Sequence, residues 1–149
     1  MKNRLNSRLG FVVNDVARLM RWSFDRQSQG LGLTRAQWSV LAYLKHSDGS
    51  KQTLLAQLME IKPTTLARHI DRLETEGWVV RRDDPEDRRA KRVFLTGRAA
   101  PMLASLTKLG QKVRQQALAG ITPEEEAMMI AVLMRIRDNL AGSGDSSDE

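Results

Sequence analysis

Residues 61–96 read IKPTTLARHIDRLETEGWVVRRDDPEDRRAKRVFLT, and this stretch decides the fold. Pro63 suits the first turn of a helix, where its missing N–H is not needed, and Gly77 is placed to end that helix in a left-handed conformation. Residues 78–82 and 91–95 are rich in β-branched and aromatic side chains and bracket a charged loop. The stretch therefore predicts a helix followed by a two-stranded antiparallel hairpin.

The helix predicted over residues 63–76 has two distinct faces. At 100° per residue, Leu66, Ile70 and Leu73 fall close together and form an anchoring face. A second arc carries hydrogen-bond donors and positive charge but no carboxylate, and its members are Thr65, Arg68, His69 and Arg72. Such an arc is typical of a helix that reads the major groove of DNA. A solvated helix face is the alternative interpretation, and for His69 a solvated or phosphate-contacting role is favoured over base reading.

Two shorter helices are predicted before this one. Thr34 and Gln37 have the spacing of a capping box at the start of a helix that runs to about Lys45. After the turn HSDGS (46–50), a short helix over about 52–59 leads through a corner to Pro63. A short helix, a corner and a second helix with a basic outer face form a helix-turn-helix, and the hairpin that follows makes it a winged helix. Residues 34–97 are therefore predicted to form a DNA-binding domain.

Longer helices flank this domain. Apolar residues recur at helical spacing over about 6–25 and again over 98–119, and the last helix begins at Thr122-Pro123. That last helix is apolar nearly all round over 127–134, which predicts burial on two sides with a second protomer as the additional cover. We therefore assign residues 1–33 and 98–141 to dimerisation helices and expect 142–149, GSGDSSDE, to be a disordered tail. The predicted fold is mainly α with a small β wing.

The loop of the predicted hairpin and the start of its second strand, residues 83–92, hold four acids followed by four bases within five residues. Aspartate and proline favour a tight turn, and Asp87 is expected to orient a neighbouring arginine through a carboxylate–guanidinium pair. Arg88 and Arg89 then lie near the tip, where a narrow minor groove attracts arginine most strongly. Lys91 and Arg92, on the rising strand, are better placed for phosphates. A metal site on the four acids is disfavoured, because the adjacent bases pair with them.

Composition narrows the classes of function. The net charge of +6 and a pI near 10.2 suggest a polyanionic partner, with nucleic acid first. The chain has no cysteine and only two histidines, so neither a metal centre nor a cofactor is predicted. It has no glycine-rich phosphate loop, no nucleophile elbow and no H-E-x-x-H motif, so we do not expect an enzyme.

The sequence also predicts no membrane partner. The longest apolar run, residues 127–134, is far shorter than the ~20 residues that a membrane-spanning helix needs. The basic start of the chain leads into no apolar signal core. A cytoplasmic protein is therefore expected.

Three runs resemble the MarR family of winged-helix transcription regulators: LTRAQWSVLAYL (33–44), IKPTTLARHIDRLETEGWVVRR (61–82) and DPEDRRAKRVFLT (84–96). The motifs DVARLMR (15–21) and DRRAKR (87–92) resemble the SlyA branch in particular. The resemblance covers about residues 10–140. It implies a homodimer with interlocked first and last helices on a pseudo-palindromic operator. It also implies Arg68 in the major groove beside Thr65, and Arg89 in the minor groove with support from Arg88.

The family often binds small anionic or phenolic effectors between its dimerisation helices and its DNA-binding lobe. In this chain the basic first helix, through Arg18 or Arg21, would suit the charge of an aromatic carboxylate, and Trp38 on the second helix would suit its ring. Core packing is the alternative role for Trp38. The chain lacks the cysteine of the peroxide-sensing members and the histidine cluster of the zinc-sensing ones. The alternative function is an architectural DNA-binding protein that counters DNA-coating silencers without an effector.

Overall fold

The computed structural model describes residues 8–142. The predicted tail, 142–149, lies outside this range except for its first glycine, and so do residues 1–7 of the predicted N-terminal dimerisation segment. The chain divides into two compact units, Met1–Val113 and Arg114–Glu149, and the division falls within one long helix.

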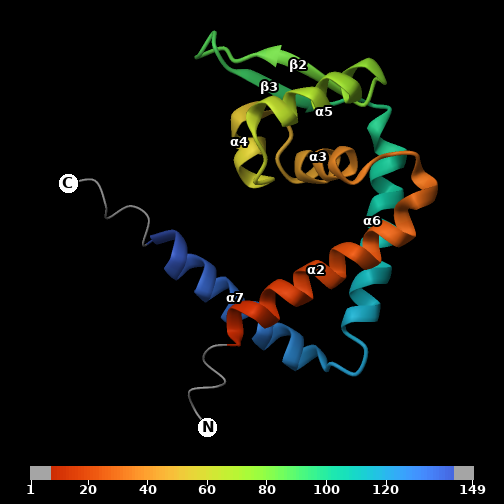
Figure 1. Cartoon of the computed structure of the whole chain (residues 1–149), viewed down its shortest axis with the longest axis vertical. Helices are drawn as coiled ribbons and strands as arrows, with labels where there is room; N and C mark the ends of the chain where they lie inside the picture. The colour runs from red at the N-terminus through yellow and green to blue at the C-terminus, as the bar shows by residue number, and fades with distance from the viewer. Residues whose placement is uncertain (1–7, 143–149) are drawn as a thin grey trace. The chain divides into compact units, whose positions relative to one another are not determined.

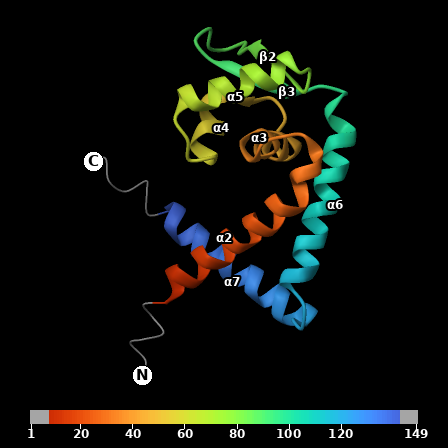
Figure 2. The same ribbon diagram turned by 45° about the vertical axis from the view of Figure 1, so that its right-hand side comes forward.

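The first unit contains a winged helix. Its elements are α2 (Leu9–Ser28), a 3-10 turn η1 (Gln29–Leu31), α3 (Arg35–His46), β1 (Ser50–Lys51), α4 (Gln52–Leu58), α5 (Pro63–Thr75), β2 (Val79–Asp83), β3 (Lys91–Leu95) and most of α6 (Ala99–Ala117). Figures 1 and 2 show α5 lying beside the β2–β3 hairpin, whose loop projects outward. The predicted fold class, mainly α with a small antiparallel wing, is confirmed.

One apolar core joins α3, α4, α5 and the sheet. Its fully buried side chains are Val40, Leu41, Leu44, Leu55, Leu66, Ile70, Leu73 and Val93. On α5 the buried residues are the three that helical periodicity predicted. Each buried side chain of this size contributes about 1.5–3 kcal/mol. The helix is therefore held firmly along one edge.

The predicted helix ends are confirmed, with one shift. The Gln37 N–H donates to Thr34 Oγ1 (3.3 Å) and the Thr34 N–H donates to Gln37 Oε1 (3.0 Å), which completes the capping box of α3. Gly77 has φ +82°, and the Trp78 N–H donates to the Leu73 carbonyl (2.8 Å), which closes α5 in a Schellman motif. Helix α2 continues to Ser28, a little beyond the predicted 6–25, and the left-handed residue that follows it is Gly32 (φ +77°).

The sheet has a third strand that the sequence pattern missed. The segment predicted as a simple turn, 46–50, leads into β1, which pairs with β3 so that the strand order is β1-β3-β2. Gly49, just before β1, has φ +79°, and a Cβ atom there would lie only 2.7 Å from Cε1 of Phe94. Only glycine fits this position without a shift of the Phe94 ring.

The corner between α4 and α5 holds a glutamate in the left-handed region. Glu60 has φ +54°, and it is the only non-glycine residue with a positive φ within 8–142. The Ile61 N–H donates to the Ala56 carbonyl and the Glu60 N–H to the Gln57 carbonyl, both at 3.1 Å, so α4 ends in a Schellman motif. A left-handed conformation costs a side-chain-bearing residue about 1–2 kcal/mol. The surrounding packing and hydrogen bonds must offset this cost.

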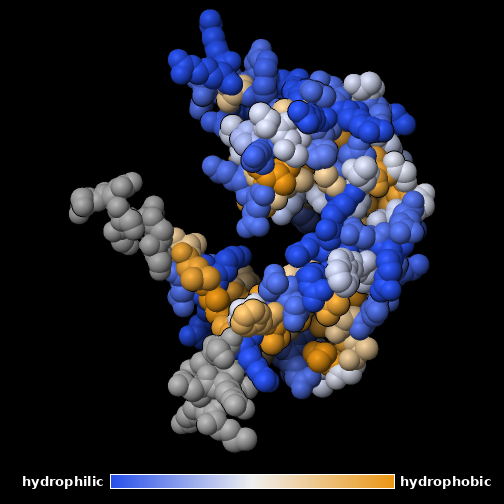
Figure 3. Space-filling view, viewed as in Figure 1, coloured by the Kyte–Doolittle hydropathy of each residue, from blue (hydrophilic) through white to orange (hydrophobic). Residues whose placement is uncertain are grey.

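The second unit consists of the end of α6 and α7 (Pro123–Gly142). The Glu125 N–H donates to Thr122 Oγ1 (3.1 Å) and the Thr122 N–H donates to Glu125 Oε2 (3.0 Å), so the predicted start of this helix is confirmed. No residue of α7 is buried. Figure 3 shows hydrophobic side chains gathered on the exposed lengths of α7 and α2, whereas the end of the wing is hydrophilic.

We predict that Gly49→Ala lowers the free energy of unfolding by about 2 kcal/mol, because the added Cβ combines a left-handed strain with an overlap on Phe94. Urea denaturation measures this change. Gly97→Ala is the matched control, because Gly97 lacks a positive φ and a Cβ there would meet nothing within 4 Å. Equal stability of the two variants would contradict the prediction.

Candidate nucleic-acid interface

The outer arc of α5 carries the side chains that were predicted to read DNA. Thr65, Arg68 and Arg72 are exposed, and His69 is half-buried. Arg72 Nε lies 3.3 Å from Glu76 Oε1, one turn further along the helix. The opposite edge of α5 is sealed into the core, so the arc is presented to solvent on a rigid support.

The wing is organised around a buried carboxylate, Asp84, whose side chain has no exposed surface. Arg92 Nε donates to Asp84 Oδ2 (2.9 Å), and Lys51 Nζ lies 3.8 Å from the same oxygen. The N–H groups of Glu86 and Asp87 donate to Asp84 Oδ1 at 2.8 and 3.3 Å. One side chain thus ties the loop, β3 and β1 together.

These contacts keep Asp84 ionised. The hydrogen bond from the Glu86 N–H, with the charge of Arg92 and the Asp87 N–H, lowers the pKa of Asp84 below its usual value. Burial acts in the opposite direction, but it is outweighed. The negative charge therefore persists throughout the neutral pH range.

Asp87 supports the wing in a different way from the one we predicted. It was expected to pair with an arginine side chain, but its Oδ1 accepts a hydrogen bond from the backbone N–H of Arg89 (2.9 Å). Its carbonyl accepts from the Ala90 N–H (3.0 Å). The carboxylate–guanidinium pair of the wing is formed by Asp84 and Arg92 instead. Asp87 therefore shapes the backbone of the tip while leaving the guanidinium groups of Arg88 and Arg89 free.

The two bases predicted to contact phosphate both have partners inside the wing. Arg92 is half-buried, and besides Asp84 it donates to the Gly49 carbonyl (3.0 Å). Lys91 forms an ion pair with Asp83, its partner in the β2–β3 register, and both side chains are exposed. Because Arg92 is committed to the wing interior, a structural role fits it better than the phosphate contact that we expected.

The arginines and lysines that were predicted to contact DNA thus fall into two groups. Arg72, Lys91 and Arg92 each pair with an acid. Arg68, Arg88 and Arg89 form no ion pair with any residue within 8–142, and all three side chains are exposed. An unpaired guanidinium keeps its full charge and all its donors for an outside acceptor.

The wing and α5 form one continuous surface. A hollow of about 120 Å³ is lined by Pro63 at the start of α5, by Gln52 and Thr53 at the start of α4, and by Arg89, Ala90 and Lys91 of the wing. Arg89, one of the two unpaired arginines of the wing, therefore lies next to the first turn of α5.

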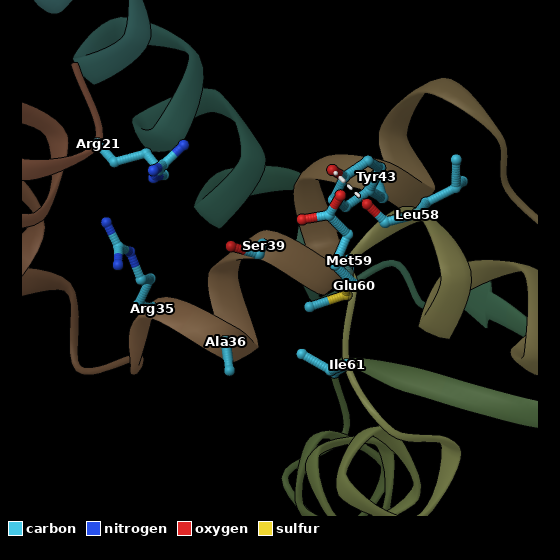
Figure 4. Close-up of a pocket in the computed structure, with 9 residues that line it drawn as sticks. All are labelled: Arg21, Arg35, Ala36, Ser39, Tyr43, Leu58, Met59, Glu60 and Ile61. Carbon is cyan, nitrogen blue, oxygen red and sulfur yellow. Dashed lines mark hydrogen bonds between the residues drawn. The ribbon is translucent and has the colours of Figure 1, made fainter. Parts of the chain in front are cut away.

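The three residues predicted to hold an effector do not come together within one protomer. Arg21 lines a hollow of about 450 Å³ between α2, α3 and the α4–α5 corner. Figure 4 shows Arg21 and Arg35 at one end of this hollow, with Tyr43 and the corner residues at the other. Trp38 lines a separate hollow of about 260 Å³ with Lys45 and Leu103.

Trp38 and Arg18 also have partners within the chain. The Trp38 ring packs against Phe24, with 4.4 Å between centroids. Arg18 lines neither hollow. It pairs with Asp15 (2.9 Å) and lies over the Trp22 ring.

No cluster of three or more metal-ligating side chains occurs within residues 8–142. In the same range, none of the helices combines the length and the apolar character that crossing a bilayer requires.

Known proteins with similar sequences and structures are regulators. The model of the MarR family matches residues 33–91. The transcriptional regulator PA3341 is 37% identical, with 89% of this chain and 98% of that chain covered and a TM-score of 0.79. The transcriptional regulator SlyA is 27% identical over 88% of this chain and 92% of its own, with a TM-score of 0.73. A mutant of MarR from E. coli, complexed with operator DNA, is 26% identical over 86% and 92%, with a TM-score of 0.71.

We predict that Asp84→Asn destabilises the protein at pH 7, because an amide group would replace one of the two carboxylate oxygens that accept hydrogen bonds inside the wing. The folded-state pKa of Asp84 is lowered, so its stabilising effect is present at neutral pH and is lost as the pH falls through that lowered pKa. The stability difference between the wild type and the variant should therefore narrow in strong acid. Chemical denaturation at several pH values measures it.

The control is Asp83→Asn, which removes the same charge from the neighbouring, 73% exposed position. Its effect should be small, because exposed ion pairs contribute little. A loss of stability as large as that of Asp84→Asn would show that charge alone, and not the buried network, matters.

Proposed function

Because the chain belongs to the MarR family of winged-helix transcription regulators, we propose that it binds double-stranded DNA as a homodimer and regulates transcription from a pseudo-palindromic operator. The observation that carries this proposal is the set of unpaired, exposed arginines on α5 and on the tip of a charge-locked wing. The operator complex of the E. coli MarR mutant supports it, since that relative has the same fold.

In the proposed complex α5 enters the major groove. Arg68 has a free guanidinium that can donate two hydrogen bonds to O6 and N7 of a guanine, the commonest base-specific contact of arginine. Thr65, one turn earlier, can contact a thymine methyl group or a base edge. Arg72, already paired with Glu76, is better suited to a phosphate than to a base, and the half-buried His69 to a supporting contact.

The wing tip would reach the adjacent minor groove. Arg88 and Arg89 lie in a loop whose backbone is fixed by Asp84 and Asp87, so little backbone conformational entropy is lost when they bind. A narrow minor groove concentrates negative potential and attracts arginine. Lys91 lies on the same side as Arg89, in the hollow beside α5, and would meet a phosphate once it leaves Asp83.

The homodimer is proposed from surfaces that one protomer leaves uncovered. Helix α7 has no buried residue, and its large apolar side chains include Met128 (67% exposed) and Leu140 (71%). Helix α2 likewise exposes Phe11 (76%) and Trp22 (52%). Soluble monomers rarely expose such continuous apolar surface. Two reading helices in one dimer would also match operator half-sites about one helical turn apart, ~34 Å.

Control by a small anionic or phenolic ligand is also part of the proposal. The hollow at Arg21 combines two guanidinium groups with the ring of Tyr43 and the apolar side chains of Met59 and Ile61. It borders the corner from which α5 begins, so a ligand there can shift the reading helix. The hollow at Trp38 offers an aromatic wall and Lys45. An aromatic carboxylate has the charge and shape for either one.

We propose the SlyA-like branch on the motifs DVARLMR (15–21) and DRRAKR (87–92). An architectural protein that displaces DNA-coating silencers without an effector is the competing proposal. A ligand-controlled regulator and an architectural protein differ in sequence selectivity and in their response to a ligand.

For DNA binding, we expect Arg68→Ala and Arg89→Ala each to lose about 1–3 kcal/mol of affinity for the operator, because each removes a desolvated groove contact. The operator is obtained by selecting duplexes from a random library with the wild-type protein, and a gel-shift titration measures affinity. Arg26→Ala, which removes the same charge from α2, is the control. Wild-type affinity in both groove variants would reject the proposed interface.

For dimerisation, we expect sedimentation to give a dimer at micromolar concentration. Leu133→Asp should give a monomer or an aggregate, because it places a charge on the apolar face of α7. Leu133 is 42% exposed in the protomer, so the substitution leaves the fold of the protomer intact. Gln111→Asp places the same charge on an exposed polar site of α6 and should remain dimeric. A soluble, folded wild-type monomer at this concentration would contradict the proposed homodimer.

For ligand control, we expect millimolar salicylate to weaken operator binding. A tenfold loss requires that salicylate prefer the DNA-incompetent state by about 1.4 kcal/mol. Arg21→Ala tests the hollow beside the corner, and Trp38→Phe, which keeps an aromatic ring against Phe24, tests the other. Equal concentrations of chloride and of neutral salicylamide are the controls. If chloride acts as strongly as salicylate, ionic screening explains the loss and the architectural alternative gains support.

A further inference from the structure

Arg81, in the middle of β2, makes an unusual number of directed contacts with the reading helix. Its NH1 group donates to Asp71 Oδ1 (2.6 Å) and to Glu74 Oε1 (3.4 Å), and its NH2 group donates to the Ala67 carbonyl (2.9 Å). Its backbone N–H also donates to Glu74 Oε2 (2.7 Å). The side chain is only 19% exposed.

The same guanidinium reaches a third element. Arg81 Nε donates to Gln52 Oε1 (3.0 Å), at the first residue of α4. One side chain therefore connects β2 with both helices of the helix-turn-helix. The planar, multi-donor guanidinium is the group that can satisfy several acceptors in fixed directions, which a lysine ammonium cannot do.

The residues that Arg81 holds form one strip along α5. Ala67, Asp71 and Glu74 follow helical spacing, and the strip lies on the flank between the buried face and the exposed Arg68. Burial of Leu66, Ile70 and Leu73 determines which face of α5 is turned inward, but because apolar contacts are non-directional it leaves small rotations of the helix about its axis unspecified. Hydrogen bonds to one flank are directional and restrict that rotation.

We propose that Arg81 is a positioning residue for sequence recognition, which sets the rotation of α5 relative to the wing so that Arg68 and Arg89 reach their two grooves together. This proposal rests on the proposed DNA-binding function. Arg81 is opposite Val93 in the sheet register and only two residues before Asp83, where the wing loop begins. Loss of these hydrogen bonds from Arg81, the Arg81 clamp, would therefore allow the angle between α5 and the wing to vary while the apolar core remains.

The test compares Arg81→Met with Arg82→Met in the full-length protein. Both lose one positive charge from β2, but Arg82 is exposed, lies over the Phe94 ring and takes no part in the clamp. The ratio of affinities for the selected operator and for a scrambled duplex of the same composition should fall about tenfold in Arg81→Met. It should change little in Arg82→Met, although binding to both duplexes weakens. Without DNA, amide hydrogen exchange in α5 should be faster only in Arg81→Met.

A second pair of variants avoids any loss of folding. Asp71→Ala and Asp71→Asn remove the same charge from a 66% exposed side chain, but only asparagine keeps the acceptor oxygen for Arg81. The affinity ratio should fall in Asp71→Ala and be restored in Asp71→Asn. An unchanged ratio in both Arg81→Met and Asp71→Ala, with a selective wild type, would overturn the positioning role. A wild-type protein that selects no sequence would instead overturn the proposed function.

Discussion

Helix α5, the proposed DNA-reading helix, has to be packed into the domain on one face and left exposed to solvent on the other. Most of the first unit serves this requirement. Leu66, Ile70 and Leu73 of α5 have no exposed surface, and their partners come from α3, α4 and the sheet. A helix of 13 residues is marginal in water by itself, so this burial is what keeps it folded. The corner at Glu60 and the cap at Gly77 then determine where the helix begins and ends.

Hydrogen bonds between charged groups supply the directions that apolar packing leaves open. In the wing a buried aspartate, Asp84, orients Arg92 and the loop backbone, and on α5 the acids Asp71 and Glu74 accept hydrogen bonds from Arg81. These acids hold Arg92 and Arg81 inside the domain, whereas Arg68, Arg88 and Arg89 keep their guanidinium groups for an outside acceptor. Directed donors at fixed places favour a defined pose on DNA over uniform attraction to any phosphate.

Local signals in the sequence were sufficient for the helices and the wing strands, and signals that depend on tertiary structure were not. The capping box at Thr34, the cap at Gly77 and the apolar periodicity of α5 are all contained in a few neighbouring residues. Strand β1 has only two residues, too few to show a period of two, and its pairing with β3 spans some forty positions.

The burial of Asp84 was also hidden, because an aspartate in a charged loop is usually exposed. The double aspartate before Pro85 was the available signal, since aspartate side chains bond backbone N–H groups two residues on. That Arg21 and Trp38 line separate hollows depends on how α2, α3 and α6 pack, which no local pattern encodes.

Helix α7 has a consequence for the life of the protein in a cell. In a single newly made protomer, α7 has no buried residue, and chaperones and proteases recognise such exposed apolar surface. If two protomers dimerise through this surface as proposed, the rate of dimerisation rises with the square of the protomer concentration. Copies made at low expression would therefore be turned over faster, molecule for molecule, than copies made at high expression. Such a threshold in dosage would come from the fold of one helix, without any dedicated degradation signal.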